Sequence, residues 1–328
     1  IMPFEKLKKI LLRLYFSYTK KYLFDLFIAL GLSLCVAGST ASIAWLLDPA
    51  IKKMFIEQDQ SMMILIPFAI IISFMVKGYT LYTARVILIK IAAKIVFTMQ
   101  NQLSSSYIKS DLHELESRHS GEYVSHIMFD VGQVNSLVTN GVLNLMKDPL
   151  TLIVLVGLMF YQNWKLAIFA LIVMPLAAIV AKSLGKRMGK AVTERAKINA
   201  SLTTYFQEML KGSRMVRIFQ RENFELDRAD KILTKNMNLS NKVAFIMIRV
   251  QPIMEVITGF MIAGFIYYSG FMIVSGEMGI NNFFSFLTAM MLAYQPIRSL
   301  ATINMLFYQG AAGAERVFKS NTQSNAKH

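Results

Sequence analysis

The amino-acid sequence predicts an all-α, polytopic membrane protein with six long transmembrane helices that continue into the cytoplasm. Of the 328 residues, 55% are hydrophobic and 17% are charged, whereas ordinary globular proteins have about 45–50% and about 25%. The mean hydropathy is +0.45, and six stretches approach the roughly 20 helical residues that cross a bilayer. These observations exclude a soluble enzyme and a disordered chain. The single cysteine excludes a disulfide-rich secreted scaffold.

Residues 1–22 are expected to form an elbow helix on the cytoplasmic surface of the membrane. Between Phe4 and Tyr18, lysines and an arginine alternate with leucines and isoleucines, as in helices that lie in the membrane interface. The first span follows at about 23–47. Its uncharged run is longer than the roughly 7–15 apolar residues of a signal peptide, so we expect a retained anchor.

The remaining spans are expected at about 62–82, 142–161, 166–181, 252–274 and 283–309. Only the segment from Gln162 to Lys165 joins the third span to the fourth, so these two must form a tight hairpin with Trp164 at the interface.

Lysine and arginine residues indicate the orientation, because cytoplasmic loops carry their excess. Residues 1–22 hold six of them, 83–141 five, 182–242 fourteen and 310–328 three, and the opposite side holds only Lys52, Lys53 and Lys165. Both termini are therefore expected in the cytoplasm. The net charge of +15 fits loops that face anionic lipid, and no nucleic-acid partner is expected because the basic residues flank spans.

The two long inner connections each contain a helix-breaking point, at Ser120-Gly121 and at Gly212-Ser213. Connections of this length without a globular core are uncommon unless they are functional. The pattern predicts two helical hairpins whose charged tips dock a soluble partner. A solvated charged loop is the simpler alternative.

Three motifs follow one another around the spans: Ser120-Gly121-Glu122-Tyr123-Val124-Ser125, Glu208-Met209-Leu210-Lys211-Gly212 and Pro296-Ile297-Arg298-Ser299-Leu300. In this order the sequence resembles the transmembrane domain of ABC exporters of the half-transporter type, and within that group the bacterial lipid A flippases. The resemblance implies that residues 111–119 and 207–217 are coupling helices, which sit in grooves of nucleotide-binding domains. The positions that this assigns to coupling are Asp111, His113, Glu114, Arg118, Gly121, Glu208, Lys211, Gly212 and Arg214. One departure is His126, which stands where relatives commonly have arginine.

A Walker A loop has the pattern G-x-x-x-x-G-K-[ST], and the nearest run does not match it. The run from Gly185 to Ala191 has one residue too few between its glycines and an alanine after its lysine. In relatives a nucleotide-binding domain begins just after the position of Phe318, so 319–328 is expected to be a tail. This chain alone is expected to hydrolyse no ATP and to hold no cofactor. ATP and Mg would bind to a nucleotide-binding domain of the same gene or of a separate chain.

Charged residues within spans are functional candidates, because each costs roughly 2.5–3.5 kcal/mol at the bilayer centre. They are Lys77, Lys147, Asp148, Arg249, Glu255 and Arg298. Lys77, Lys147 and Arg298 are expected in the inner halves of their spans, and we interpret them as a ring that binds the phosphates of an amphipathic lipid. The resemblance implies the same role, although Gln295 replaces one further basic residue of that family. Snorkelling, or pairing with Asp148 and Glu255, is the alternative.

The resemblance implies a homodimer in a bacterial inner membrane, with the fourth and fifth spans crossing to the partner. It would flip an anionic lipid from the inner to the outer leaflet by alternating access. A multidrug or peptide exporter would share every feature except the basic ring. An ion-coupled secondary transporter would need intramembrane acids, and a non-transporting assembly factor would need no ATPase. No metal site is expected, because the spacing of His113, His119 and His126 is not that of a zinc site.

Overall fold

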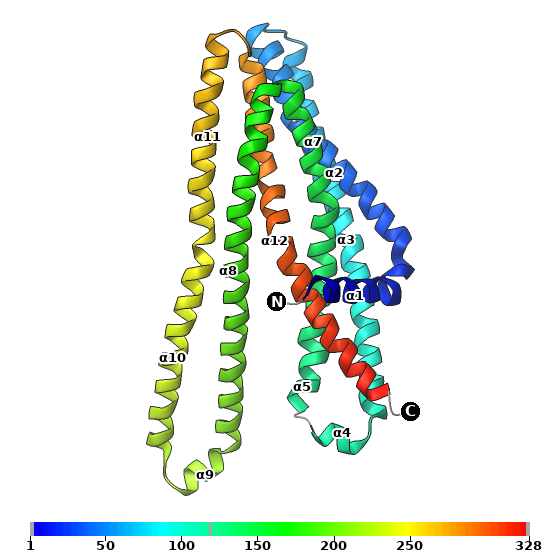
Figure 1. The fold of residues 1–328 in the computed structure, drawn as a ribbon, viewed down its shortest axis with the longest axis vertical. Helices are drawn as coiled ribbons and strands as arrows, with labels where there is room; N and C mark the ends of the chain where they lie inside the picture. The colour runs from blue at the N-terminus through cyan, green and yellow to red at the C-terminus, as the bar shows by residue number, and fades with distance from the viewer. Residues whose placement is uncertain (1–2, 118–119, 326–328) are drawn as a thin grey trace. The chain divides into compact units, whose positions relative to one another are not determined.

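The computed structural model describes residues 3–117 and 120–325, and every regular element in these ranges is a helix, as Figure 1 shows. This confirms the all-α fold. The α-helices are α1 (Phe4–Leu14), α2 (Leu23–Pro49), α3 (Met62–Lys109), α4 (Leu112–Ser117), α5 (Ser120–Ser125), α6 (Val131–Ser136), α7 (Leu143–Gln162), α8 (Trp164–Lys211), α9 (Ser213–Ile218), α10 (Glu222–Ile248), α11 (Val250–Val274) and α12 (Ile280–Asn325). Short π-helical segments at Tyr15–Thr19, Ala50–Ile56, His126–Asp130 and Leu137–Val142 and a 3₁₀ turn at Lys20–Tyr22 extend several of them.

Within the described residues, five helical stretches are long and apolar enough to cross a membrane. They are Phe4–Ile56, Met62–Lys109, Tyr123–Gln162, Trp164–Lys211 and Glu222–Val274. The sixth predicted span lies inside α12, where Gln295 and Arg298 interrupt the apolar sequence. The long helices extend well beyond the roughly 20 residues needed to cross a bilayer, since α3 and α8 have 48 residues each.

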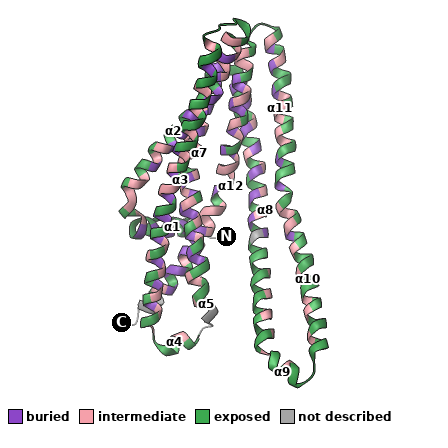
Figure 2. Ribbon diagram, turned by 180° about the vertical axis from the view of Figure 1, so that it is seen from behind, coloured by how far each residue is buried: buried purple, intermediate pink, exposed green. Residues whose placement is uncertain are grey.

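The chain divides into two compact units, Ile1–Leu176 with Phe265–His328 and Ala177–Gly264. In the first unit, α2 packs on α3 and α7, and α12 packs on α7, α2 and α6. Its core contains a buried stripe of α3 that includes Leu88, Ile95 and Met99, together with Val134 of α6 and Ala314 of α12. Figure 2 shows buried residues on the facing sides of these helices.

Glycines allow α12 to approach the segment before α7 closely. A Cβ at Gly313 would lie 2.7 Å from the carbonyl oxygen of Asp130, and a Cβ at Gly310 would lie 2.6 Å from the Cβ of Leu137. Small residues permit such backbone contact between membrane helices. The sequence Gly310-Ala311-Ala312-Gly313-Ala314 therefore determines how closely α12 packs here.

Polar contacts hold the other end of α12 to α2. The amide of Asn281 donates a hydrogen bond of 2.6 Å to Asp48, and the hydroxyl of Ser285 donates one of 2.8 Å to the carbonyl oxygen of Ala44. Phe265 of α11 stacks on Phe286 of α12 with ring centroids 5.1 Å apart. Hydrogen bonds thus fix α12 against α2, and aromatic stacking fixes α12 against α11.

The second unit contains the later part of α8, then α9 and α10, and the first part of α11. Large apolar side chains of α10 are exposed in it, including Phe224, Leu233, Met237 and Phe245.

Candidate functional site: a basic group in the spans and two helical tips

Lys77 of α3 and Lys147 of α7 are half-buried and close enough for their positive charges to repel each other. The Nζ of Lys147 lies 3.6 Å from Oδ1 of Asp148, whose side chain is 3% exposed. Ser299 of α12 forms a side-chain hydrogen bond with the same carboxyl group. Asp148 therefore connects α7 to α12.

Arg298 is also half-buried and directly precedes Ser299 on α12. The three basic residues expected to form a ring thus lie on three helices of one unit, α3, α7 and α12. Gln295 is exposed one turn before Arg298. Among the described residues, Lys77 has no ion-paired acid and Lys147 has only Asp148. The positive charge of these lysines therefore exceeds the negative charge beside them, as in a site for an anion.

The first tip is the short helix α4. Its backbone begins with a hydrogen bond of 3.1 Å from the amide of Leu115 to the carbonyl oxygen of Asp111. Asp111 and His113 are exposed, and so is Leu112, with 75% of its surface accessible. Arg118 lies outside the described residues, as do the side chain of Glu114 and the surroundings of Gly121, which is in α5.

The second tip is α9, which follows α8 after a break at Gly212, where the sequence predicts one. The backbone amides of Met215 and Val216 donate hydrogen bonds of 3.0 and 3.2 Å to the carbonyl oxygen of Gly212. Glu208, Lys211 and Arg214 are exposed around this break.

The exposed surface of the second tip has apolar side chains at its centre and basic side chains beside them. Met215, Ile218 and Phe219 have 57%, 63% and 66% of their surface exposed, and Lys211, Arg214 and Arg217 are exposed beside them. An exposed apolar group with a polar rim is typical of a protein-binding surface.

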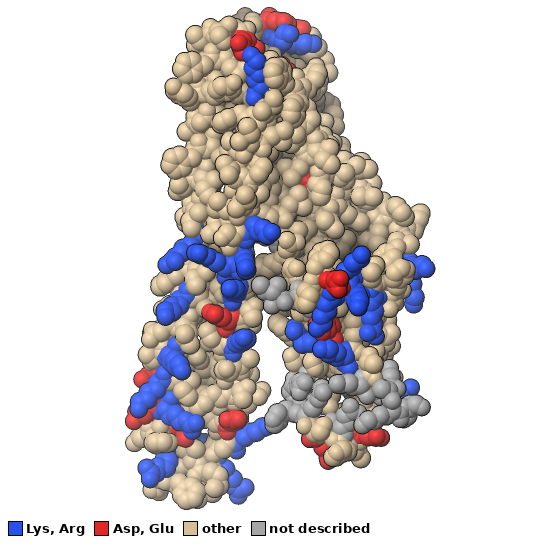
Figure 3. Space-filling model, viewed as in Figure 1, with Lys and Arg blue, Asp and Glu red and all other residues tan. Residues whose placement is uncertain are grey.

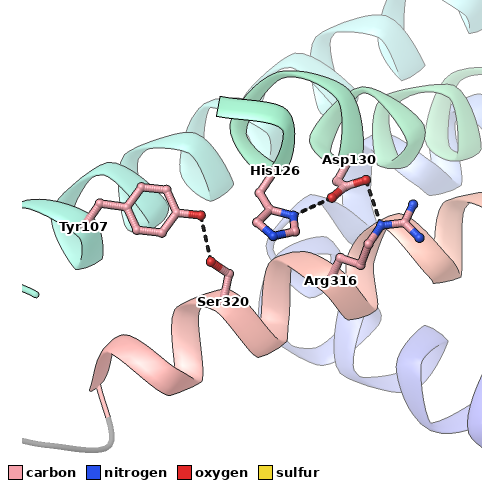
Figure 4. Close-up of polar contacts among 5 residues, drawn as sticks. All are labelled: Tyr107, His126, Asp130, Arg316 and Ser320. Atoms are coloured by element: carbon pink, nitrogen blue, oxygen red, sulfur yellow. Dashed lines mark hydrogen bonds and ion pairs between the residues drawn. The ribbon is translucent and has the colours of Figure 1, made fainter. Parts of the chain in front are cut away.

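A network around Asp130 was not among the sites expected from the sequence. Asp130 is buried, and its carboxylate accepts a hydrogen bond of 2.8 Å from Nε of Arg316 and lies 2.6 Å from Nδ1 of His126. Figure 4 shows these residues with Tyr107 and Ser320, whose hydroxyl groups lie 2.7 Å apart. The i,i+4 spacing of His126 and Asp130 was a visible signal. The partner, Arg316, lies 186 residues further along the chain, so no local pattern indicates it.

Among the described residues, no group of three or more histidine, cysteine, aspartate or glutamate side chains could hold a metal ion. His119 lies outside the described residues.

The sequence comparisons identify the family. Residues 26–297 match the ABC transporter transmembrane region. The ATP-dependent lipid A-core flippase of Syntrophus aciditrophicus is 37% identical over 284 residues, which are 86% of this chain and 47% of that protein. The flippase of Desulfotalea psychrophila is 32% identical over 311 residues, 95% of this chain and 54% of that protein. The chain spans about half the length of these curated relatives. It therefore belongs to the family of ABC transporter transmembrane regions.

Proposed function

We propose that this chain is the transmembrane domain of an ATP-driven exporter that moves an anionic amphipathic lipid, such as a lipid A-like glycolipid or a phospholipid, from the inner to the outer leaflet. Lys77, Lys147 and Arg298 bind the phosphate groups of the lipid while its acyl chains contact apolar side chains of the spans. The relatives named as lipid A-core flippases support this substrate class.

The observation that carries the proposal is the juxtaposition of Lys77 and Lys147 with a single neighbouring acid, Asp148. Like charges repel strongly where little water screens them. A phosphate group placed between the ammonium groups would remove that repulsion and form charge-assisted hydrogen bonds. The empty site is thus destabilised relative to the lipid-bound site.

The free energy of ATP binding and hydrolysis acts on the transporter through the two tips, α4 and α9. Nucleotide-binding domains, of the same gene or of a separate chain, bind ATP and Mg and dock on α4 and α9. Closure of these domains moves the tips, and the long helices transmit the movement to the spans, so that the lipid site opens alternately to each leaflet. The complete transporter is a homodimer in the bacterial inner membrane, with both termini in the cytoplasm.

The proposal is tested in the complete transporter, reconstituted in liposomes with its nucleotide-binding domain. The triple variant Lys77→Ala/Lys147→Ala/Arg298→Ala removes the basic group, so we expect the stimulation of ATP turnover by a phosphorylated glycolipid to be lost. The matched control is Lys77→Arg/Lys147→Arg/Arg298→Lys, which keeps all three charges and should retain most of the stimulation.

Unchanged stimulation in the alanine variant would refute the ring of phosphate-binding residues. Native mass spectrometry of the chain in mild detergent gives a second readout. One phosphorylated lipid per dimer in the unmodified chain, absent from the alanine variant, is the expected result. Stimulation by uncharged drugs, with no effect of phosphorylated lipid, would instead favour a multidrug exporter.

A further inference from the structure

A pocket of about 400 Å³ lies between α1 and the last part of α12. We call it the elbow pocket. Its charged lining consists of Lys6, Lys9 and Arg13 of α1 and Glu315 and Lys319 of α12. Figure 3 shows Lys and Arg side chains gathered over this part of the surface. With four cations and one carboxylate, the pocket carries a clear excess of positive charge.

The carboxylate is already paired with two of these cations through its Oε1 atom. Glu315 lies 2.7 Å from the Nζ of Lys6 and 3.1 Å from the Nζ of Lys319. The hydrogen bond from Lys6, with a further one from Lys319, holds the pKa of Glu315 below its usual range, so this group stays negative at neutral pH. Among the described residues, Lys9 and Arg13 have no ion-paired acid. Their charges are therefore available to an anionic ligand.

Packing holds Arg13 in place in the absence of a ligand. Its guanidinium carbon lies 4.3 Å from the centroid of the Phe318 ring, which also stacks against Tyr18. Phe318 is 5% exposed and Ile10 is 8% exposed, so the base of the pocket is apolar and well packed. A planar guanidinium group fixed in this way is well suited to bind phosphate oxygens.

The opposite surface of α1 indicates where the ligand comes from. Phe4 and Leu12 of α1 have 74% and 45% of their surface exposed, and Phe16 of the π-helical segment that follows has 61%, whereas Leu7 and Leu14 are buried against the protein. Exposed basic residues such as Lys8 and Lys9 lie on the same helix, and a mixture of exposed apolar and basic side chains is typical of a helix at the level of the lipid head groups. With α1 at that level, lipid head groups can reach the exposed Lys9, Arg13 and Lys319 of the elbow pocket.

We propose that the elbow pocket binds the phosphate group of an anionic phospholipid of the surrounding membrane. The bound lipid joins α1 to the part of α12 that carries Glu315 and Lys319, and so stabilises the contact between these helices. This inference does not depend on which substrate the spans transport.

The experiment measures hydrogen exchange in α1 of the full chain in mild detergent, during a titration with phosphatidylglycerol. Exchange in this helix reports on the elbow pocket and not on the basic residues of the spans. The variant Lys9→Gln/Arg13→Gln removes the two cations of the pocket that have no ion-paired acid among the described residues. Each cation that contacts the phosphate group directly contributes about a fivefold change in affinity. We therefore expect half-maximal protection to need about 25-fold more phosphatidylglycerol.

The matched control is Lys8→Gln, because Lys8 is exposed on the same helix and does not line the pocket. We expect it to change the half-maximal concentration by less than twofold. The proposal would be overturned if the double variant and the unmodified chain reached half-maximal protection at the same phosphatidylglycerol concentration. Equal protection by phosphatidylcholine, or by inorganic phosphate, would also overturn it, since the first indicates an apolar lipid contact and the second a site for a soluble anion.

Discussion

The side chain of Asp130 connects helical segments that are far apart in the sequence. It is 3% exposed and contacts His126 of its own segment and Arg316 of α12. A buried carboxylate is stable only when partners replace the water that it has lost. Arg316 also directly follows Glu315 of the elbow pocket, so neighbouring residues of α12 contact both α1 and the segment that precedes α6.

We expect Arg316→Ala to destabilise the chain by about 1–3 kcal/mol, because it leaves the buried Asp130 with His126 alone. The value lies below that of a fully buried pair because 48% of the Arg316 side chain is exposed. Thermal unfolding in detergent measures it. Arg228→Ala, which removes only a surface contact of 3.8 Å to Glu225, should change stability by less than about 0.5 kcal/mol. If Asp130→Asn and Arg316→Ala had fully additive effects, the two residues would not be coupled.

At the scale of elements, the sequence predicts helices better than it predicts their contacts. Hydropathy and charge place the spans because a bilayer imposes length and polarity on each segment separately. Gly212 correctly indicates the end of α8. In the first connection the sequence predicts a break at Ser120-Gly121, whereas α3 already ends at Lys109 and α5 begins at Ser120. The side chain of Ser110 bonds to the carbonyl oxygen of Ser106 at that end, a local competition that composition does not reveal.

The residues of the candidate site are likewise predicted better than their contacts. Lys77, Lys147 and Arg298 are identified from sequence because charge is rare within spans. The hydrogen bond between Ser299 and Asp148, and the contact between Arg316 and Asp130, depend on how α12 is rotated against its neighbours. That rotation follows from side-chain packing over the whole unit, so no single segment encodes it.

The packing of α12 can be tested with the same substitution at two glycines. Gly313→Ala places a methyl group 2.7 Å from the backbone oxygen of Asp130. The helices must then separate, and we expect a loss of about 1–3 kcal/mol. Gly132→Ala, on the facing α6, meets no atom within 4 Å. It should stabilise by up to about 1 kcal/mol through helix propensity. Thermal unfolding of both variants measures the difference, and equal effects would mean that Gly313 is not needed for close packing.

At the scale of the whole molecule, exposed apolar side chains of α10 indicate a surface that a partner buries. Leu233 and Met237 lie one turn apart and are 43% and 56% exposed, and adjoining exposed apolar side chains mark a candidate interaction site. Both residues lie in the connection 182–242 that the sequence predicts to be cytoplasmic, where no lipid tails would cover them. A second copy of the chain is the partner that the proposed homodimer supplies.

We therefore expect Leu233→Glu/Met237→Glu to weaken the dimer by at least about tenfold, because two new charges would be buried in an apolar interface. These positions are four residues apart and lie on one face of α10. The control is Asn238→Glu, which adds a charge at an exposed polar position of the same helix and should leave the dimer intact. Native mass spectrometry over a range of protein concentrations measures the monomer fraction. An equal monomer fraction in both variants would show that this face of α10 is not the dimer contact, and the apolar side chains would then belong to a surface for another partner.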